Sequence, residues 1–290
     1  MTRRKADLLA RASALSPLSA ADLTILCDFL YSRTGMQFGE SKRYYVDRRV
    51  ADRMVENDLV RFADYFALLR ATPSEAEQLI NSFTINETYF YREEHQLACL
   101  SNSILPEIIR SKRPGDKVRI WSVPCSSGEE PYSIAIWLLE NWGLVDAYNV
   151  EIVGSDIDTA IVAEALEANY SRRAVMRLPP ELVERYFAPV QGGRIRLIDD
   201  LRESVTFTPC NITDTASVSR QGQFDVIFCR NLLIYFDASA RVRCMQNLFN
   251  SLVPGGYMCL GHSESMARIS ERFITRRFPE AIVYQRPERV

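Results

Sequence analysis

The sequence predicts a doubly wound α/β domain that follows an all-helical N-terminal domain. From Arg119 onward, short apolar runs alternate with helix-length amphipathic stretches, which is the pattern of parallel strands joined by crossover helices. Residues 1 to about 80 show apolar side chains at helical spacing instead. With 290 residues, the chain is long enough for two domains that each bury a core.

The helical domain is predicted from capping residues and from apolar periodicity. Ser19 is placed to cap a first helix, which Gly35 ends. A second helix is expected to begin at Ser41 or at the residue before it. Two further amphipathic stretches follow over residues 61–70 and 74–83.

The second helix carries a basic face. Lys42, Arg49 and Arg53 share this face because spacings of seven and four residues place them on one side of a helix. One interpretation is an ordinary solvated surface. The other is a docking strip for an acidic partner helix, to which these cations would be complementary.

The α/β domain is expected to begin with a strand over residues 118–123 and a helix over residues 131–141. The run over residues 224–229 is suited to a central strand that is buried on both faces. The remaining strands are expected over residues 150–155, 257–260 and 281–285, and the remaining helices over residues 158–169 and 240–252.

Residues 117–131 predict a ligand-binding turn between the first strand and the first helix. The small residues 126–128 let backbone N–H groups approach a ligand, and Pro131 suits the start of a helix. Glu129 and Glu130 would repel a phosphate. They suit a cation, or the hydroxyl and amine groups of a nucleoside with an amino-acid tail, and S-adenosylmethionine has these groups. An ordinary turn with exposed acids is the alternative.

The second strand of this unit ends at Asp156. An acid at this position is placed to accept both hydroxyl groups of a ribose. Ligands of doubly wound folds lie at the carboxyl ends of the strands. We therefore expect the small-residue turn, Asp156, Asn211, Arg230 and Asn231 to lie at one edge of the sheet.

Two stretches interrupt the regular pattern. Residues 84–95 mix amide, aromatic and charged side chains, which is typical of a ligand lid or of a linker whose aromatic side chains pack between domains. Residues 189–208 predict a small antiparallel insertion, with a long decorated crossover as the alternative. We therefore expect a helical domain over residues 1–80, a junction over 81–95 and an α/β domain over 96–290.

The composition argues against several classes of protein. The formal net charge of −2 does not favour broad electrostatic binding of nucleic acid. Seven scattered cysteines and only two histidines argue against a structural zinc site and a disulfide framework, and they favour a reducing cytoplasm. No apolar run has the length needed to span a bilayer.

Five stretches, in the same order along the chain, together resemble the chemotaxis receptor methyltransferases of the CheR family. They are T-I-N-E-T-Y-F-Y-R-E (84–93), W-S-V-P-C-S-S-G-E-E-P-Y-S-I-A (121–135), S-D-I-D-T (155–159), I-F-C-R-N-L-L-I-Y-F (227–236) and L-V-P-G-G-Y-M-C-L-G-H-S-E (252–264). The resemblance implies a Rossmann-like class I methyltransferase domain with a small β-subdomain. It also implies transfer of a methyl group from S-adenosylmethionine to glutamate side chains of bacterial chemoreceptors, which leaves S-adenosylhomocysteine and needs no metal.

The resemblance further implies a set of cofactor contacts in the junction and at the strand ends. The matched positions are Asn86, Thr88, Arg92, Glu129, Asp156, Asn211, Ile212, Arg230 and Asn231. The sequence departs from the family pattern at Pro124 and Cys125, where small residues are common, and at Glu87, where a neutral residue is frequent.

The chemistry of this reaction asks for positioning. A glutamate carboxylate is already ionised at neutral pH, and the methyl group on a sulfonium is already activated. We therefore assign Arg92 and Tyr235 to orienting the substrate carboxylate or the carboxylate of the cofactor. We expect His262 to be a hydrogen-bonded loop residue. The alternatives are a salt bridge from Arg92 to Glu93 or Glu94, and simple packing of Tyr235.

The implied partner is the cytoplasmic helical domain of methyl-accepting chemoreceptors, which the basic face would contact. In some members of the family the β-subdomain captures a receptor C-terminal peptide by strand addition. We expect no nucleic-acid partner, no membrane insertion and a monomer. A methyltransferase for another substrate and a cofactor-binding signalling module are the alternatives. Measured methyl transfer would distinguish an enzyme from the binding module. The residues after Asn231 lack the Pro-Pro-aromatic run of amino-methylating enzymes, which argues against a substrate that is methylated on nitrogen.

Overall fold

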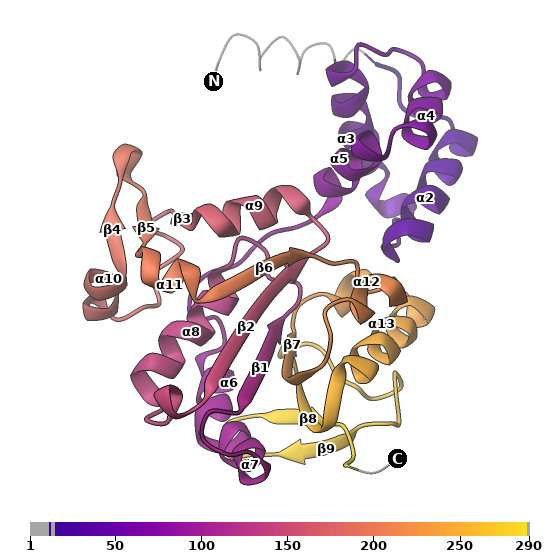
Figure 1. Cartoon of the computed structure of the whole chain (residues 1–290). Helices are drawn as coiled ribbons and strands as arrows, with labels where there is room; N and C mark the ends of the chain where they lie inside the picture. The colour runs from indigo at the N-terminus through magenta and orange to yellow at the C-terminus, as the bar shows by residue number, and fades with distance from the viewer. Residues whose placement is uncertain (1–11, 13–14, 289–290) are drawn as a thin grey trace. The chain divides into compact units, whose positions relative to one another are not determined.

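The chain forms two compact units, which we describe separately. The computed structural model describes residue 12 and residues 15–288 (Figure 1). The units are residues 1–85 with 235–237, and residues 86–234 with 238–290.

The first unit is built from helices. They are α2 (Ala20–Thr34), α3 (Arg43–Glu56), α4 (Phe62–Ala71) and α5 (Pro73–Phe83), with a 3-10 turn at Glu40–Lys42 before α3. As predicted, the Ser19 side chain accepts a hydrogen bond from the Asp22 N–H, and α2 ends at Gly35, whose φ of 74° is left-handed. Val46 and Val50 lie on the buried stripe of α3. These caps and stripes explain why the sequence folds locally into these helices.

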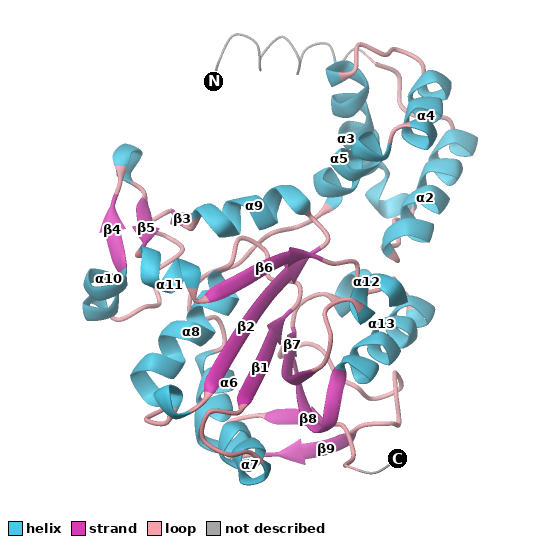
Figure 2. Cartoon of the chain, viewed as in Figure 1, coloured by secondary structure: helices cyan, strands magenta, loops and turns pink. Residues whose placement is uncertain are grey.

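The second unit contains a seven-stranded sheet with the order β6-β2-β1-β7-β8-β10-β9 (Figure 2). The first five strands in this order run parallel, and β10 is antiparallel to both of its neighbours. The prediction of a doubly wound α/β domain is therefore confirmed. The strands are β1 (Lys117–Ser122), β2 (Asn149–Asp156), β6 (Val205–Pro209), β7 (Phe224–Cys229), β8 (Leu252–Leu260), β9 (Ile274–Arg277) and β10 (Ile282–Gln285).

Helices flank this sheet, and a continuous apolar cluster joins them to it. The cluster includes Val118 of β1, Phe228 of β7 and Ile134 of α8. All six residues of β7 are buried, which explains its apolar sequence. The helices are α6 (Glu94–Cys99), α7 (Leu105–Ile108), α8 (Glu129–Asn141), α9 (Thr159–Glu167), α12 (Thr215–Ser219) and α13 (Ala238–Ser251). No described helix has the length and apolar character needed to cross a membrane.

An insertion between α9 and β6 forms a second, antiparallel sheet with the order β3-β5-β4. Its elements are β3 (Asn169–Tyr170), α10 (Pro180–Tyr186), β4 (Phe187–Pro189), β5 (Ile195–Leu197) and α11 (Asp199–Glu203). The prediction of an antiparallel insertion is confirmed, but its bounds at 189–208 are wrong, because β6 pairs in parallel with β2. β6 lies at the edge of the large sheet. An edge strand alternates between buried and exposed side chains, as strands of an insertion do.

Candidate active site

The turn between β1 and α8 places backbone groups close to a ligand site. Ser126 and Gly128 both have left-handed φ values, of 49° and 92°. A Cβ atom on Gly128 would lie 3.1 Å from the side chains of Ala165 and Tyr132. The position therefore requires glycine for space as well as for conformation. The buried Ser126 Oγ has no hydrogen-bond partner among the described residues.

Asp156 ends β2 directly beside this turn. Its carboxylate accepts hydrogen bonds from the Ser126 N–H at 2.9 Å and the Asp158 N–H at 3.0 Å. Burial raises the pKa of Asp156 to about 6, although these backbone hydrogen bonds oppose the shift. The carboxylate thus lies where a ribose of a nucleoside ligand is expected in this fold.

Glu129 is the first residue of α8 and faces the same region. Only 4% of it is exposed, and its carboxylate accepts a hydrogen bond of 2.7 Å from Ser127 Oγ. Burial raises the pKa of this carboxyl group. A buried carboxylate with a single hydroxyl partner is suited to a cationic or hydroxyl-bearing ligand.

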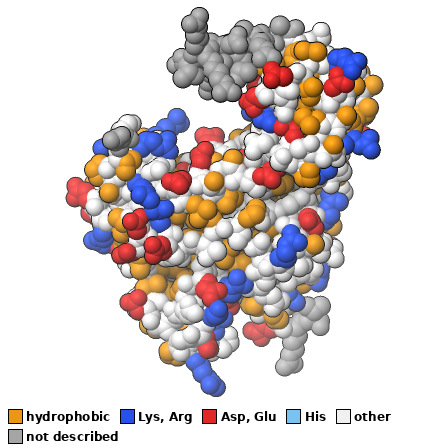
Figure 3. Space-filling view, turned by 45° about the horizontal axis from the view of Figure 1, so that its top comes forward, with side chains coloured by type: hydrophobic (Ala, Val, Ile, Leu, Met, Phe, Trp, Pro, Cys, Tyr) orange, Lys and Arg blue, Asp and Glu red, His pale blue; other side chains and the backbone are white. Residues whose placement is uncertain are grey.

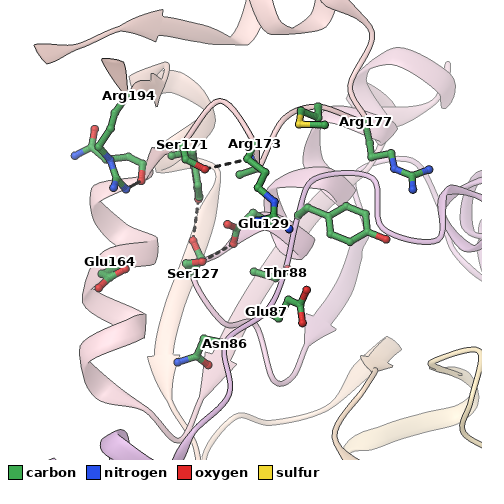
Figure 4. Close-up of a pocket in the computed structure, with 15 residues that line it drawn as sticks. Asn86, Glu87, Thr88, Ser127, Glu129, Glu164, Ser171, Arg173, Arg177 and Arg194 are labelled. Atoms are coloured by element: carbon green, nitrogen blue, oxygen red, sulfur yellow. Dashed lines mark hydrogen bonds between the residues drawn. The ribbon is translucent and has the colours of Figure 1, made fainter. Parts of the chain in front are cut away.

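A pocket of about 530 Å³ opens beside Glu129, between the junction and the insertion (Figure 4). Its volume lies within the range of small-molecule sites, about 300–1,000 Å³. Three of the predicted cofactor residues line it, namely Asn86, Thr88 and Glu129. Asn86 also donates a hydrogen bond of 3.0 Å to the Asp158 carboxylate, which connects the junction to the loop after Asp156.

Arg92 lies near this pocket but is not among its lining residues. Its guanidinium donates a hydrogen bond of 2.9 Å to the Glu87 carbonyl and lies 5.7 Å from the ring centre of Tyr89. Within the described part of the second unit, Arg92 forms no salt bridge with Glu93 or Glu94. The salt-bridge alternative for Arg92 is therefore not observed.

Arg230, at the end of β7, is enclosed by internal partners. Its guanidinium pairs with Glu130 at 2.5 Å and with Glu93 at 3.2 Å, and it donates to the Arg92 carbonyl at 2.9 Å. Only 5% of Arg230 is exposed. These partners tie the junction to α8, and the cofactor contact that the resemblance implies for Arg230 stays a prediction.

Asn231 follows with a left-handed φ of 59°. Its N–H donates a hydrogen bond of 2.8 Å to Glu264, and the N–H groups of Leu233 and Gly261 donate to the same carboxylate at 2.7 and 2.9 Å. Glu264 therefore holds the loop after β7 in place. Glu264 was not predicted from the sequence, although it lies within the last matched stretch, two residues after His262.

His262 is a hydrogen-bonded loop residue, as predicted. Its Nδ1 lies 2.8 Å from a Glu93 carboxylate oxygen, and 68% of its side chain is exposed. Burial raises the pKa of Glu93, but Arg230 and His262 outweigh burial and hold this pKa below its ordinary value. Glu93 is therefore a second structural acid that the sequence analysis did not identify.

Asn211 and Ile212 follow β6, the neighbour of β2 in the sheet. Asn211 uses its side-chain oxygen to accept hydrogen bonds from the N–H and hydroxyl groups of Thr213, at 3.0 and 2.8 Å. Ile212 is 5% exposed, and its carbonyl accepts from the Asn247 amide. Neither residue lines the pocket, but both follow a strand end adjacent to that of Asp156.

Tyr235 and the predicted docking cations belong to the first unit. The Tyr235 carbonyl accepts a hydrogen bond from the Gln37 N–H, and its ring centre lies 5.9 Å from Lys42 Nζ. Lys42 is exposed, and the Arg49 guanidinium lies 3.8 Å from the ring centre of Tyr45. A common role of Tyr235 and Arg92 stays a prediction.

Arg53 does not share the exposure of Lys42. Its side chain is 14% exposed, and it forms ion pairs with Glu75 and Glu56. Glu75 also accepts a hydrogen bond of 2.9 Å from the Tyr65 hydroxyl. The predicted basic face is therefore not uniform, because Arg53 is engaged inside the helical unit.

The small-residue turn, the two buried acids and the doubly wound sheet are the features expected of an S-adenosylmethionine-dependent methyltransferase. The carboxylates of Asp156 and Glu129 fit a cofactor with a ribose and positive charges. The described residues contain no cluster of His, Cys, Asp and Glu that could hold a metal ion.

Comparison with known proteins identifies the family. Residues 86–282 match the family described as CheR methyltransferase, SAM binding domain, and residues 21–84 match its all-alpha domain. The chain belongs to the CheR methyltransferase family. It is 46% identical over 264 residues to chemotaxis protein methyltransferase 2 of Vibrio cholerae, covering 90% of this chain and 91% of the relative.

A second relative is chemotaxis protein methyltransferase Cher2 of Pseudomonas putida. It is 33% identical over 264 residues, covering 89% of this chain and 94% of the relative. Among solved structures, the N-methyltransferase NodS from Bradyrhizobium japonicum is 14% identical with a TM-score of 0.39, covering 72% of this chain and 93% of NodS. The family assignment does not rest on that remote likeness.

Proposed function

We propose that this protein transfers a methyl group from S-adenosylmethionine to glutamate side chains of bacterial chemoreceptors, forming methyl esters. The carrying observation is a pair of buried acids that suit a cationic cofactor, Glu129 in the pocket and Asp156 at the end of β2, in a chain whose relatives are named chemotaxis protein methyltransferases. We place the reaction in the cytoplasm. The seven free cysteines support that location, since free thiols are usual in a reducing compartment.

The residues at the site have positioning roles in this reaction. When bound, the cofactor supplies an activated methyl group. Asp156 accepts hydrogen bonds from the ribose, and the turn at Ser126 and Gly128 brings the backbone close to it. Glu129 faces the positive charge of the cofactor. No residue needs to accept a proton, because the glutamate substrate is already an anion at neutral pH.

We assign Arg92 to orienting a carboxylate, either that of the substrate or that of the cofactor. Support comes from its position beside the pocket and from its guanidinium, which donates one hydrogen bond within the described part of the chain and leaves most of its N–H donors for a ligand. Asn86, Thr88, Asn211, Ile212 and Asn231 are proposed to complete the cofactor site. Tyr235 keeps its proposed role of orienting a carboxylate. Arg230 is assigned to positioning the junction.

We propose that the acidic helical domain of the receptor docks on α3. Lys42 is exposed and Arg49 is half-buried against a tyrosine ring, so both present positive charge on the first unit. Arg53 has a structural role through Glu75. A receptor C-terminal peptide could add to the insertion at β4, which is an edge strand, although Pro189 offers no N–H to such a pairing.

The test uses labelled S-adenosylmethionine and receptor-containing membranes. Carboxyl methyl esters release methanol in alkali, whereas N-methyl groups do not. Alkali-labile label on receptor bands is the expected result. Binding of the cofactor without any labile label would contradict the proposed substrate and favour another substrate or a binding module.

A further inference from the structure

One wall of the pocket carries arginine side chains without acidic partners. Arg173, Arg177 and Arg194 line the pocket from the insertion, and all three are exposed. Among the described residues, neither Arg173 nor Arg177 has a carboxylate within ion-pairing distance. On the face shown in Figure 3, Lys and Arg side chains lie over the insertion, interspersed with acidic ones. Positive charge is therefore available at the rim of the pocket.

Arg173 and Arg177 lie on the loop between β3 and α10, which is held against the site by hydrogen bonds. The Ala174 carbonyl accepts a hydrogen bond of 2.9 Å from the Phe90 N–H, in the junction. The Tyr170 hydroxyl donates a hydrogen bond of 2.9 Å to the Ser127 carbonyl, in the turn. Val175 is buried under the loop. The loop is thus attached to both the junction and the turn, which places the backbone of Arg173 and Arg177 beside the pocket.

A tyrosine ring connects the arginine rim to the candidate orienting residue. The guanidinium of Arg177 lies 5.8 Å from the ring centre of Tyr89, and that of Arg92 lies 5.7 Å from the same centre. Two cations share one ring, and no ion pair is recorded for either within the described residues. Such an arrangement attracts an anion, because the two positive charges add and the ring limits hydration on one side.

The pocket is lined by acidic as well as basic side chains, because Glu87, Glu129 and Glu164 line it with the three arginines. Glu129 lies on the floor, where the cationic cofactor is expected. In Figure 4, Arg173 extends from the insertion toward Glu129, and Arg177 lies farther out. We assign Arg92 to orienting the carboxylate of the cofactor or of the reacting glutamate. Arg173 and Arg177 are therefore both available to other acidic groups of a macromolecular substrate.

We propose that Arg173 and Arg177 form a recognition subsite for acidic side chains that flank the reacting glutamate in the substrate. This inference rests on the proposed function, because it names the chemistry by which that substrate is selected. The subsite acts through charge complementarity at the rim. It therefore affects substrate affinity and its salt dependence, and it leaves both cofactor binding and the chemical step unchanged.

The test compares Arg173→Gln and Arg177→Gln with Arg172→Gln. Arg172 is an exposed residue of the same loop that does not line the pocket, so it is a matched control for net charge. We expect each rim variant to raise the KM for receptor membranes about two- to fivefold at low salt, with kcat and the cofactor Kd unchanged. The control is expected to match the unmodified protein. Arg173→Lys is expected to restore most of the affinity, because it keeps the charge.

The outcomes separate this inference from the proposed function. If the unmodified protein methylates receptors and the rim variants have an unchanged KM, the subsite is refuted while the function stands. If the rim variants weaken cofactor binding instead, the arginines hold the cofactor carboxylate, which also refutes the subsite. If the unmodified protein gives no alkali-labile label, both fail. A receptor with flanking Glu→Gln substitutions supplies an independent check, since it should lose the difference between Arg177→Gln and the unmodified protein.

Discussion

Replacing Arg230 by glutamine separates a structural role from a cofactor contact. Arg230 is the cation between Glu93 and Glu130, and it also donates to the Arg92 carbonyl. The exposed fraction of the side chain is 3% for Arg230, 11% for Glu93 and 13% for Glu130. The Arg230→Gln variant removes the positive charge and leaves two poorly hydrated carboxylates beside each other.

The expected loss of stability is large for a single substitution. Removing one partner of a buried ion pair costs about 3–5 kcal/mol, because the remaining charge stays desolvated. For a unit of about 200 residues, this loss corresponds to a fall in melting temperature of roughly 10 °C. Arg61→Gln is the contrasting variant. Arg61 also pairs with a carboxylate, that of Asp64, but its side chain is 74% exposed, so we expect no measurable change.

The stability that Arg230→Gln loses should depend on pH in a definite direction. The folded protein holds the pKa of Glu93 below its ordinary value. The ionised carboxylate therefore stabilises the folded state in full at pH values above the pKa that Glu93 has in the unfolded chain. This stabilisation is lost as the pH falls through the lower pKa of the folded state. The difference between Arg230→Gln and the unmodified protein should therefore be largest near pH 7 and should shrink toward pH 4.

Urea unfolding followed by circular dichroism measures the stability, and calorimetric titration measures cofactor binding at a temperature where the variant is folded. The reasoning predicts a large change in unfolding free energy with the cofactor Kd changed only slightly. An unfolding free energy within about 1 kcal/mol of the unmodified protein, together with a strong loss of cofactor affinity, would show that Arg230 is a ligand contact.

Three further predictions concern the remaining parts of the molecule. Gly128→Ala should destabilise the fold by about 1–2 kcal/mol, because a side chain at this left-handed position is strained and crowded. Urea unfolding measures the loss of stability, and an unchanged unfolding midpoint would contradict the expected steric strain. Cofactor affinity should fall below about pH 6, up to tenfold per pH unit, as the Asp156 carboxylate becomes protonated. Asp156→Asn should abolish that dependence in calorimetric titrations, and a persistent slope would assign it to another group. Lys42→Glu and Arg49→Glu should raise the receptor KM severalfold at low salt without changing the cofactor Kd, and loss of cofactor affinity would contradict their docking role.

Much of the fold follows from local patterns in the sequence. The fully buried strand β7 and the capped helix α2 were predictable, because apolar runs and capping residues act over a few positions. β8 was predicted to begin at Tyr257, whereas it begins at Leu252 and includes Pro254. The register shift opposite Phe224 accommodates this irregular start, and such pairing is decided by the neighbouring strand.

Residues of the candidate site were predictable where the position in the fold and the type of side chain together indicate one role. Asp156 and Glu129 were identified because an acid after a strand or a glycine turn has few structural uses. The internal ion pairs of Arg230 and Arg53 could not be predicted, because the sequence does not show whether an arginine faces a ligand or an internal carboxylate. Only the fold brings Glu75 to Arg53, from 22 residues away in the chain.

The two kinds of arginine in this protein have opposite consequences for function. Arg230 is surrounded by carboxylates, so its charge is neutralised locally and contributes little to the field that an approaching ligand meets. Arg92 and Arg177 lie beside one tyrosine ring and form no ion pair with any described residue, so their positive charge contributes to the field at the pocket. An enzyme that transfers a methyl group from a cationic cofactor to an anionic side chain needs acidic and basic side chains close together. If all of these side chains formed internal ion pairs, they would attract neither ligand. The unpaired arginines are therefore the ones whose replacement should change substrate selection.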